Sequence, residues 1–351
     1  MSSIAVAGHL CLDITPLLIG TARLDPGQLV EVGPLSISLG GCVANTGRTL
    51  ADLGASVTPF ATVGDDDLGK VLLTKLDAEG FATPRLTVSP QSTTSYSVVI
   101  EAPGVDRTFW HHTGANDEFD GTSVQLGGHD LLHVGYPTLL PGLVADGGGP
   151  LRALLARARD AGITTSLDLA VVDRSAAVGA LDWHGILESA FAQCDIASPS
   201  LDDLTSALRI EEPYSPELVD RLADRMLEQG VAVVVISAGR HGLRLKTGSA
   251  ARLHSGGAIL APLADSWADR TLTVLPSRVD EGITTNGAGD ASTAGLLFAL
   301  TRGATPELAA ALASASSAVI MAGARPTPET VVSLDASLSA LFPATRWPVA
   351  Q

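Results

Sequence analysis

Cysteine, lysine and aromatic residues are all scarce in this chain of 351 residues. The three cysteines, Cys11, Cys42 and Cys194, are too widely spaced for a zinc knuckle or a disulfide framework, which favours a reducing compartment. No apolar run reaches the roughly 18 residues of a membrane span. The first residues lack the basic segment that opens a signal peptide and are expected to form a buried strand. Together these absences predict a cytoplasmic protein.

Positive charge is also in short supply. The formal net charge is −16, and the only lysines are Lys70, Lys75 and Lys246. The sequence has no basic patch that could displace counterions, which argues against nucleic-acid binding. An ordinary acidic surface accounts for most of this charge. If the protein handles phosphate groups, it must do so with backbone amides, helix N-termini, a metal ion and a few arginines.

Aliphatic residues, in contrast, are abundant. The chain is 46% hydrophobic but only 4% aromatic, which predicts a core of small aliphatic side chains. Short β-branched runs alternate with longer helical patterns, as expected for a mainly parallel sheet covered by helices. Strands are expected over residues 4–6, 57–62, 131–134, 164–168, around 196 and over 231–237. Helices are expected over residues 43–53, 68–79, 151–161 and 216–229.

Two stretches, residues 14–39 and 93–112, interrupt this alternation. Both show strand-like patterning without intervening helices, and residues 97–100 and 107–110 flank a Pro-Gly pair as in a β-hairpin. We expect the two stretches to form one small β subdomain that projects from the α/β body. A pair of long surface loops is the alternative.

A glycine-rich string near the end of the chain carries the strongest chemical signal. Residues 284–290 read Thr-Thr-Asn-Gly-Ala-Gly-Asp and run into a helical pattern over 291–300. The glycines therefore lie at a helix N-terminus, where the amides of Ala288, Gly289 and Asp290 can hold a phosphoryl group. The Asp290 carboxylate beside them can accept a hydroxyl proton. The alternative is a helix cap and a simple glycine turn.

A second string lies near the start of the chain. Residues 40–45 read Gly-Gly-Cys-Val-Ala-Asn and enter a helix that stops at Gly54. The paired glycines let a ligand hydroxyl approach the backbone, and Asn45 offers a donor and acceptors; backbone packing alone is the alternative. Asp13 closes the first strand-like run, residues 4–13, and a carboxylate there can accept two hydrogen bonds from neighbouring hydroxyls; an exposed turn aspartate before Thr15 and Pro16 is the alternative.

The two strings resemble the signatures of the PfkB/ribokinase family, D-T-x-G-A-G-D and G-G-x-x-x-N. The resemblance extends from Asp13 to about Pro326, with the motifs in the family's order. It implies a ribokinase-like three-layer α/β sandwich, built as a single domain over residues 1–351, with the β subdomain as a lid. It also implies an ATP- and Mg²⁺-dependent kinase that phosphorylates a hydroxyl of a small carbohydrate.

The resemblance assigns roles to individual residues of the two strings. Asp290 is the catalytic base, and the anion hole is formed by Gly287, Ala288 and Gly289. The implied substrate-binding residues are Asp13, Gly40, Gly41 and Asn45. The resemblance places Thr284 and Asn286 among the nucleotide-binding residues. Thr284 replaces the usual leading Asp, at a position that helps to form the monovalent-cation site, so potassium activation stays open.

Further motifs of the family have weaker counterparts. Ser200 and Asp203 occupy the place of N-x-x-E, which implies a nucleotide contact for Ser200 and a water-mediated magnesium contact for Asp203; a helix N-cap by Ser200 is the rival interpretation. The Gly239–Gly242 spacing resembles the nucleotide-side G-x-x-G turn. Arg107 is placed on the lid, facing the substrate. Asp168, at the end of an expected strand, is a candidate for the substrate or metal side.

Two other functions stay open at this point. An adenosine-type nucleoside kinase has the same fold, and a catalytically silent sugar-binding protein would explain the changes at Thr284, Ser200 and Asp203. We also expect a homodimer in which two lids pack together through their outward faces, with Val99 or Phe109 outward. The small sheet cannot bury both of its faces within one chain.

Overall fold

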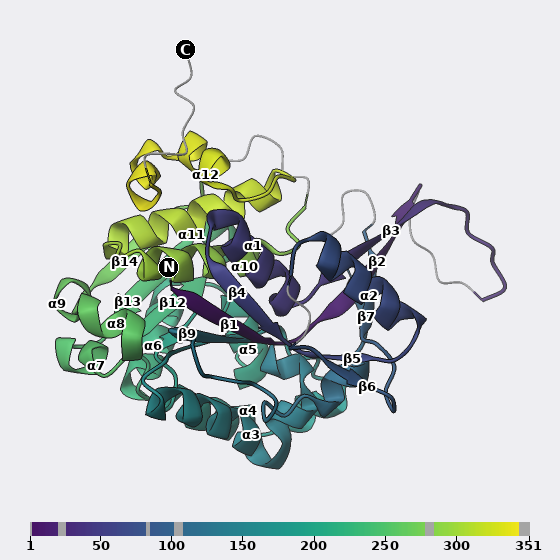
Figure 1. Cartoon of the computed structure of the whole chain (residues 1–351), viewed down its shortest axis with the longest axis horizontal. Helices are drawn as coiled ribbons and strands as arrows, with labels where there is room; N and C mark the ends of the chain where they lie inside the picture. Colours follow the sequence, from purple (N-terminus) through teal and green to yellow (C-terminus); the bar gives the residue numbers. More distant parts are fainter. Residues whose placement is uncertain (1, 20–25, 82–84, 102–107, 278–283, 344–351) are drawn as a thin grey trace.

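The fold is described from a computed structural model that covers residues 2–19, 26–81, 85–101, 108–277 and 284–343. Its largest element is an eight-stranded sheet in the order β14-β13-β12-β11-β10-β9-β1-β4 (Figure 1). The strands from β12 to β4 are parallel, and β13 and β14 are antiparallel additions at one edge. The strands are β1 Ser3–Gly8, β4 Ser56–Phe60, β9 Leu131–Gly135, β10 Thr164–Asp168, β11 Ile196–Ala197, β12 Val233–Ser237, β13 Leu243–Thr247 and β14 Thr271–Val274.

Helices cover both faces of this sheet and give three layers (Figure 1). Alternate residues of β1 show the two-sided burial: Ile4 and Val6 belong to one core cluster, Ala5 and Ala7 to the other. The first face is covered by α1 Cys42–Leu53, α2 Asp67–Ala78, α7 Ala250–His254, α8 Gly257–Leu260, α9 Ala264–Trp267, α10 Ala288–Thr301, α11 Pro306–Met321 and α12 Pro328–Leu334. The second face is covered by α3 Pro141–Asp160, α4 Trp183–Phe191, α5 Leu201–Leu208 and α6 Pro216–Glu228.

Two smaller sheets complete the fold. A four-stranded sheet has the order β3-β2-β7-β8 and projects from the body on the right of Figure 1. Its strands are β2 Cys11–Leu18, β3 Val32–Gly40, β7 Tyr96–Ile100 and β8 Thr108–His112. The third sheet pairs β5 Thr62–Gly64 with β6 Thr87–Ser89. The expected mainly parallel sheet with helices on both faces and a separate small sheet is therefore confirmed.

The limits expected for two strands were wrong. Asp13 does not close the first strand: β1 ends at Gly8, and Asp13 lies within β2 of the small sheet. Gly8 has φ 130°, and a Cβ at this position would lie 2.4 Å from the Gly135 carbonyl oxygen, so the turn there requires glycine. The expected strand over 57–62 is likewise two strands, β4 and β5, in different sheets.

The register of the small sheet assigns each side chain to a face. Asp13 pairs with Ser97, and Ser97 pairs with His111, so the three side chains share one face, here called the inner face. The Val99–Phe109 pair also lies on the inner face. The opposite, outer face contains the Val98–Trp110 pair, and α2 packs against its β2 and β3 side. Within the residues described, no helix is both long enough and apolar enough to cross a membrane.

Candidate active site

The Asp290 carboxylate lies buried at the first turn of α10, 1% exposed. Gly287 caps this helix at φ 75°, where only glycine is free of strain, and so turns the chain into the helix. Two side chains of α1 hold the carboxylate: Asn45 Nδ2 donates to Oδ2 at 3.0 Å, and Thr46 Oγ1 donates to Oδ1 at 3.0 Å. The two sequence strings, about 240 positions apart, therefore meet at one carboxylate.

Burial raises the pKa of Asp290 above its ordinary value, because the charged form loses its hydration. Hydrogen bonds from Tyr136, Asn45 and Thr46 oppose that shift, whereas the negative charge of Asp13 adds to it. The carboxylate is thus a stronger base than a solvated aspartate, and it is fixed in orientation by its donors.

The backbone amides beside Asp290 differ in availability. The Ala288 amide already donates to the Thr285 carbonyl at 3.3 Å, and the Ala291 amide donates to the Gly287 carbonyl at 2.9 Å. Gly289 and Asp290 occupy the intervening first-turn positions, whose amides have no acceptor within the helix. A Cβ built on Gly289 would meet nothing within 4 Å. The two amides are therefore without a helical partner, and the Gly289 backbone is exposed.

Asp13 is the second buried carboxylate of the site, 5% exposed. Its Oδ2 accepts a hydrogen bond from Asn286 Nδ2 at 3.1 Å, which ties β2 to the string that precedes α10. The carboxylate packs directly on Gly40, where a Cβ would lie 2.5 Å from Asp13 Oδ1. Gly40 is therefore needed to admit the Asp13 side chain, a packing reason for the first glycine of the pair.

Gly41 has a packing reason of the same kind. It has φ 85°, and a Cβ there would lie 2.5 Å from the His9 carbonyl oxygen and 2.7 Å from His9 Nδ1. Both glycines let α1 begin close against the chain between β1 and β2. This close approach places Asn45, one turn into α1, beside Asp290.

Two histidines connect the inner face of the small sheet to the body. His111 Nδ1 lies 3.0 Å from Ser97 Oγ, and His111 Nε2 lies 3.3 Å from His9 Nε2. Burial lowers the pKa of His9 well below its usual value, and burial together with His112 lowers the pKa of His111 to about 4. Both imidazoles are therefore neutral near pH 7, and they share one N–H···N hydrogen bond.

Asp168, at the end of β10, belongs to a second cluster of buried polar side chains near Asp290. Its Oδ1 accepts the Leu169 amide at 2.8 Å, and Thr293 Oγ1, on α10, lies 3.3 Å from its Oδ2 and 3.0 Å from Ser198 Oγ. Burial raises the pKa of Asp168 well above its usual value, and the charges of Asp203 and Asp290 raise it further. Three carboxylates thus repel one another in the buried part of the site.

Ser200 and Asp203 form a reciprocal capping box at the start of α5. Asp203 Oδ2 accepts the Ser200 amide at 2.8 Å, and the Asp203 amide donates to Ser200 Oγ at 3.1 Å. The helix-cap interpretation of Ser200 is therefore confirmed. Burial raises the pKa of Asp203 to about 6. No group of three or more His, Cys, Asp or Glu side chains that could hold a metal ion comes together within the described ranges.

The Gly239–Gly242 turn follows β12, next to β11 and Ser200. Ser200 and Ser237 form an isolated parallel bridge, which brings this turn beside the start of α5. Gly239 has φ 51° and open space around a built Cβ, whereas a Cβ on Gly242 would lie 2.1 Å from the Val274 carbonyl oxygen. Gly239 is thus open to a ligand, and Gly242 is fixed by packing on β14. Arg107 lies outside the described residues.

Thr284 makes one hydrogen bond within the glycine-rich string and one to α11. Its hydroxyl accepts the Asn286 amide at 3.0 Å, and its own amide donates to the Met321 carbonyl at 3.4 Å. These bonds hold Asn286 where it contacts Asp13.

Sequence reasoning missed several residues that the structure brings to the site. They are His9, Thr46, Ser97, Tyr136 and Thr293. One available signal was position: His9 follows β1 and Tyr136 follows β9, at the carboxyl edge of the parallel sheet where ligands of such sheets bind. Thr46 adjoins Asn45, whereas Ser97 depends on strand register and had no local signal.

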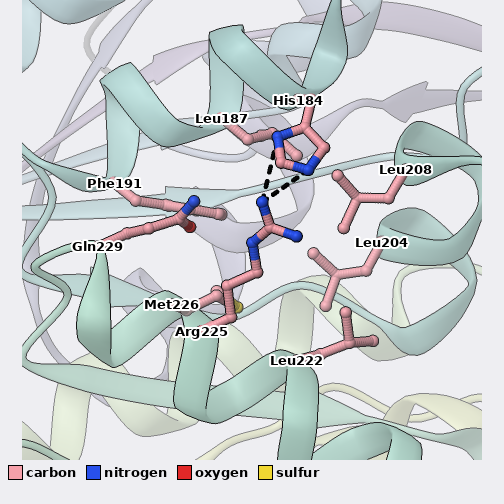
Figure 2. Close-up of a pocket in the computed structure, with 9 residues that line it drawn as sticks. All are labelled: His184, Leu187, Phe191, Leu204, Leu208, Leu222, Arg225, Met226 and Gln229. Atoms are coloured by element: carbon pink, nitrogen blue, oxygen red, sulfur yellow. Dashed lines mark hydrogen bonds between the residues drawn. The ribbon is translucent and has the colours of Figure 1, made fainter.

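A separate apolar cavity lies between α4, α5 and α6 (Figure 2). Leucine, phenylalanine and methionine side chains line it, and Arg225 reaches across to His184, with Nη2 2.6 Å from Nε2. None of the residues around Asp290 or Asp13 lines this cavity. It belongs to the packing of the second helical layer.

Comparison with known proteins identifies the family. The sequence model of the pfkB family of carbohydrate kinases matches residues 1–327, so this chain belongs to that family. The enzymes of this family are carbohydrate kinases, which are phosphotransferases that act on an alcohol hydroxyl group.

Individual relatives are more distant. The bifunctional protein HldE of Pelobacter propionicus is 26% identical over 308 residues, which are 85% of this chain and 54% of that protein; the chain spans about half of its length. A ribokinase of Arabidopsis thaliana complexed with ribose and ATP has a TM-score of 0.71 at 16% identity, covering 95% of this chain and 99% of that one. A nucleoside kinase of Burkholderia thailandensis in complex with inosine has a TM-score of 0.67 at 19% identity, covering 97% and 98%. The expected ribokinase-like fold is thereby confirmed.

The repulsion among the buried carboxylates predicts a pH-dependent effect on stability. Because the folded-state pKa of Asp168 is raised, folding is penalised increasingly as the pH rises from about 4 towards that pKa. Asp168→Asn keeps an acceptor for the Leu169 amide and removes the charge. Its free energy of unfolding should exceed that of the wild type at pH 8, and the excess should shrink as the pH falls towards 4.

Denaturant titrations at several pH values, without added metal, measure this difference. Asp160→Asn, at an exposed position at the end of α3, is the control and should show no difference that grows with pH. An Asp168→Asn protein that is less stable than the wild type at pH 8 would contradict the electrostatic account of this cluster.

Proposed function

We propose that the protein is an ATP-dependent sugar kinase that transfers the γ-phosphoryl group to a hydroxyl of a small carbohydrate. One observation carries the proposal: the buried Asp290 carboxylate lies at the N-terminus of α10, held by Asn45 and Thr46, next to two first-turn amides that have no partner within the helix. Membership of the carbohydrate-kinase family supports the same reaction.

In the proposed reaction, Asp290 accepts the proton of the attacking hydroxyl. Asn45 and Thr46 each donate to one of its oxygens, and the carboxylate has a lone pair left for a substrate hydroxyl. The substrate oxygen forms a bond to the γ-phosphorus as the bond to the leaving ADP oxygen breaks. Phosphoryl transfer passes through a loose transition state, so orientation of the hydroxyl matters more than the strength of the base.

The amides of Gly289 and Asp290 are proposed to form the anion hole, together with the backbone of Gly287 and Ala288. They lie at a helix N-terminus, where the helix dipole favours negative charge. Because the Ala288 amide already has an acceptor at 3.3 Å, most of this stabilisation is assigned to the next two amides. A magnesium ion bound with ATP would neutralise phosphate charge, and Asp203 is the residue proposed to hold it through water.

Substrate hydroxyls are proposed to bind at Asp13 and Asn45, close to Gly40 and Gly41. Asp13 is buried and oriented by Asn286, so it can accept hydrogen bonds from two neighbouring hydroxyls. The nucleotide is proposed to lie along Ser200, Gly239, Gly242, Thr284 and Asn286. Gly239 has the most open backbone of the turn that follows β12. A monovalent cation near Thr284 and a substrate contact by Asp168 remain hypotheses of the same kind.

The substrate class is tested by incubating the protein with MgATP and separate panels of pentoses, hexoses, sugar acids and nucleosides. ADP release and phosphorus NMR of the product identify any phosphorylated acceptor. Transfer to a neutral sugar supports the proposal. Transfer to nucleosides alone would favour the adenosine-type alternative, and the absence of transfer to every acceptor would favour a silent sugar-binding protein.

The role of Asp13 gives a sharper prediction. Asp13→Ala should lower kcat/KM for the sugar by a factor of roughly 30 to 1,000, since charge-assisted hydrogen bonds contribute about 1.5–3 kcal/mol each. The dissociation constant of ATP, measured by calorimetry, should change less than about twofold. Asp160→Ala serves as the control. Equal weakening of ATP and sugar binding would place Asp13 on the wrong side of the site.

We further propose that the protein is a homodimer in which the outer faces of the two small sheets pack together. Leu35 and Trp110 lie on this face, 57% and 47% exposed, beside the partly buried Ile14, Ile37 and Val98. An apolar sheet face of this kind is usually covered. The earlier expectation for Val99 and Phe109 was wrong: the two residues are cross-strand partners on the inner face, and Val99 is 2% exposed.

Trp110→Asp should therefore convert the dimer to a monomer at micromolar concentration, because it buries a charge in the proposed interface. Phe109→Asp, the neighbouring residue on the opposite face, should leave the dimer intact. Light scattering coupled to size-exclusion chromatography measures both. A wild-type protein that is monomeric at this concentration would refute the dimer without affecting the proposed chemistry.

A further inference from the structure

Two imidazoles meet where the small sheet lies against the main sheet. His9 directly follows β1, at the carboxyl edge of the main sheet, and His111 lies on β8, the edge strand of the small sheet. Their Nε2 atoms lie 3.3 Å apart, and their ring centroids lie 4.9 Å apart with the planes inclined by 62°. The reaction proposed above gives neither residue a part, although His9 is only 3% exposed.

The second nitrogens of the two rings have different surroundings. His111 Nδ1 lies 3.0 Å from Ser97 Oγ on β7, whereas His9 Nδ1 is buried and has no hydrogen-bond partner among the described residues. A buried N–H without an acceptor is the costlier kind of unpaired group. The arrangement that avoids it has His9 protonated on Nε2, donating to His111 Nε2, and His111 protonated on Nδ1, donating to Ser97.

Few charges lie near this pair. The other titratable groups around it come from neighbouring elements: Asp13 of β2, Cys42 of α1, His112 of β8, Asp117 of the 3₁₀ helix η1 (Gly114–Glu118) and Tyr136 after β9. Burial is the largest cause acting on both rings, and it lowers the pKa of His9 well below its usual value and that of His111 to about 4. Asp117 opposes the shift of His111 without cancelling it.

The pair connects the body of the protein to the strands that hold Asp13. β8 is hydrogen-bonded to β7 alone, and β7 pairs with β2. The contacts from His9 to His111 and from His111 to Ser97 therefore run from the end of β1 to the residue that pairs with Asp13. Asp13 is itself tied to the glycine-rich string by Asn286, at 3.1 Å.

We propose that His9 and His111 are positioning residues, whose hydrogen bond fixes the inner face of the small sheet over the carboxyl edge of the main sheet and so sets the position of Asp13 relative to Asp290. This inference rests on the proposed function, in which one sugar is bound at Asp13 and gives up its proton at Asp290. Such a sugar spans both sheets, so a shift of the small sheet misplaces the reacting hydroxyl. Phosphoryl transfer depends strongly on that orientation.

The first test needs no turnover. In protein labelled with ¹⁵N-histidine, NMR distinguishes protonated from unprotonated ring nitrogens, and the signals are assigned by their loss in His9→Phe and His111→Phe. We expect His9 protonated on Nε2 and His111 on Nδ1 at pH 7, with neither ring gaining a proton down to about pH 5.5. In His9→Phe the His111 Nε2 signal should shift, because that nitrogen loses its donor.

Two results would overturn the proposal. One is a wild type in which His9 or His111 titrates near the ordinary pKa of about 6.5. The other is a His111 Nε2 signal that is the same with and without His9. His254→Phe, at an exposed position at the end of α7, is the control and should leave the signals of both rings unchanged.

The wild-type titration also covers the case in which the phenylalanine variants do not fold. The chain has eight histidines, and His133 should stay neutral as well, because burial lowers its pKa to about 3. With His9 and His111, three histidines should therefore remain neutral at about pH 5.5. Fewer than three would overturn the proposal.

Kinetics with an active acceptor tests the positioning role. His9→Phe and His111→Phe should each lower kcat/KM for the sugar about tenfold, while the KM for ATP changes less than about twofold. The double variant should be no slower than the slower single variant, because either change removes the same hydrogen bond. His111→Gln, whose amide can replace Nε2 as the acceptor, should recover part of the loss.

Effects that multiply in the double variant would show two independent packing roles and would overturn the proposal. His254→Phe should keep the wild-type kcat/KM within about twofold. An inactive wild type would refute the proposed function, and with it the role of the pair in turnover. The NMR result would still show whether the hydrogen bond between the two sheets forms.

Discussion

The ionised carboxylate of Asp290 must remain buried at the N-terminus of α10, and much of the surrounding structure depends on that requirement. Removal from water penalises the charged form, and Asp13 adds a like charge nearby. Hydrogen bonds from Asn45 and Thr46 on α1 and from Tyr136 after β9 offset part of this cost. The close approach of α1, in turn, requires the paired glycines, because Asp13 and His9 fill the space beside them.

The site is acidic throughout, although its proposed second substrate is itself an anion. Asp13, Asp168, Asp203 and Asp290 are all buried, and the pKa values of the last three are raised. With lysine so scarce, the stabilisation of phosphate charge is assigned to oriented amides and to a metal ion that arrives with the nucleotide. The amides do not have to reorient during the reaction, because the helix already fixes their direction.

Sequence patterns predicted the fold and the two helix starts at Asn45 and Asp290 because both are encoded locally. The alternation of strand and helix patterns predicted the layers of the fold. The two glycine-containing strings predicted that Asn45 and Asp290 lie at helix starts. The contacts of His9, His111 and Tyr136 were not predictable, since they depend on how strands far apart in the chain pair. Register also decided the faces of the small sheet, which reversed the expectation for Phe109.

Local patterns were ambiguous where one residue type serves two purposes. Ser200 fits both a nucleotide contact and a helix cap, and its hydrogen bonds with Asp203 make it a cap whatever else it binds. Gly40 fits both ligand approach and close packing, and the Asp13 carboxylate occupies the space beside it. In both cases the neighbours that decide the interpretation are known only from the folded structure.

The chemistry proposed for this site depends on Asp290 taking the proton of the acceptor hydroxyl. Single-turnover transfer of the γ-phosphoryl group by Asp290→Asn, with ATP and sugar affinities measured by calorimetry, tests it most directly. We predict a loss of transfer by a factor of roughly 1,000 or more, while both ligands bind within a few fold of the wild type. A variant that retains a tenth of the wild-type transfer rate would contradict the claim.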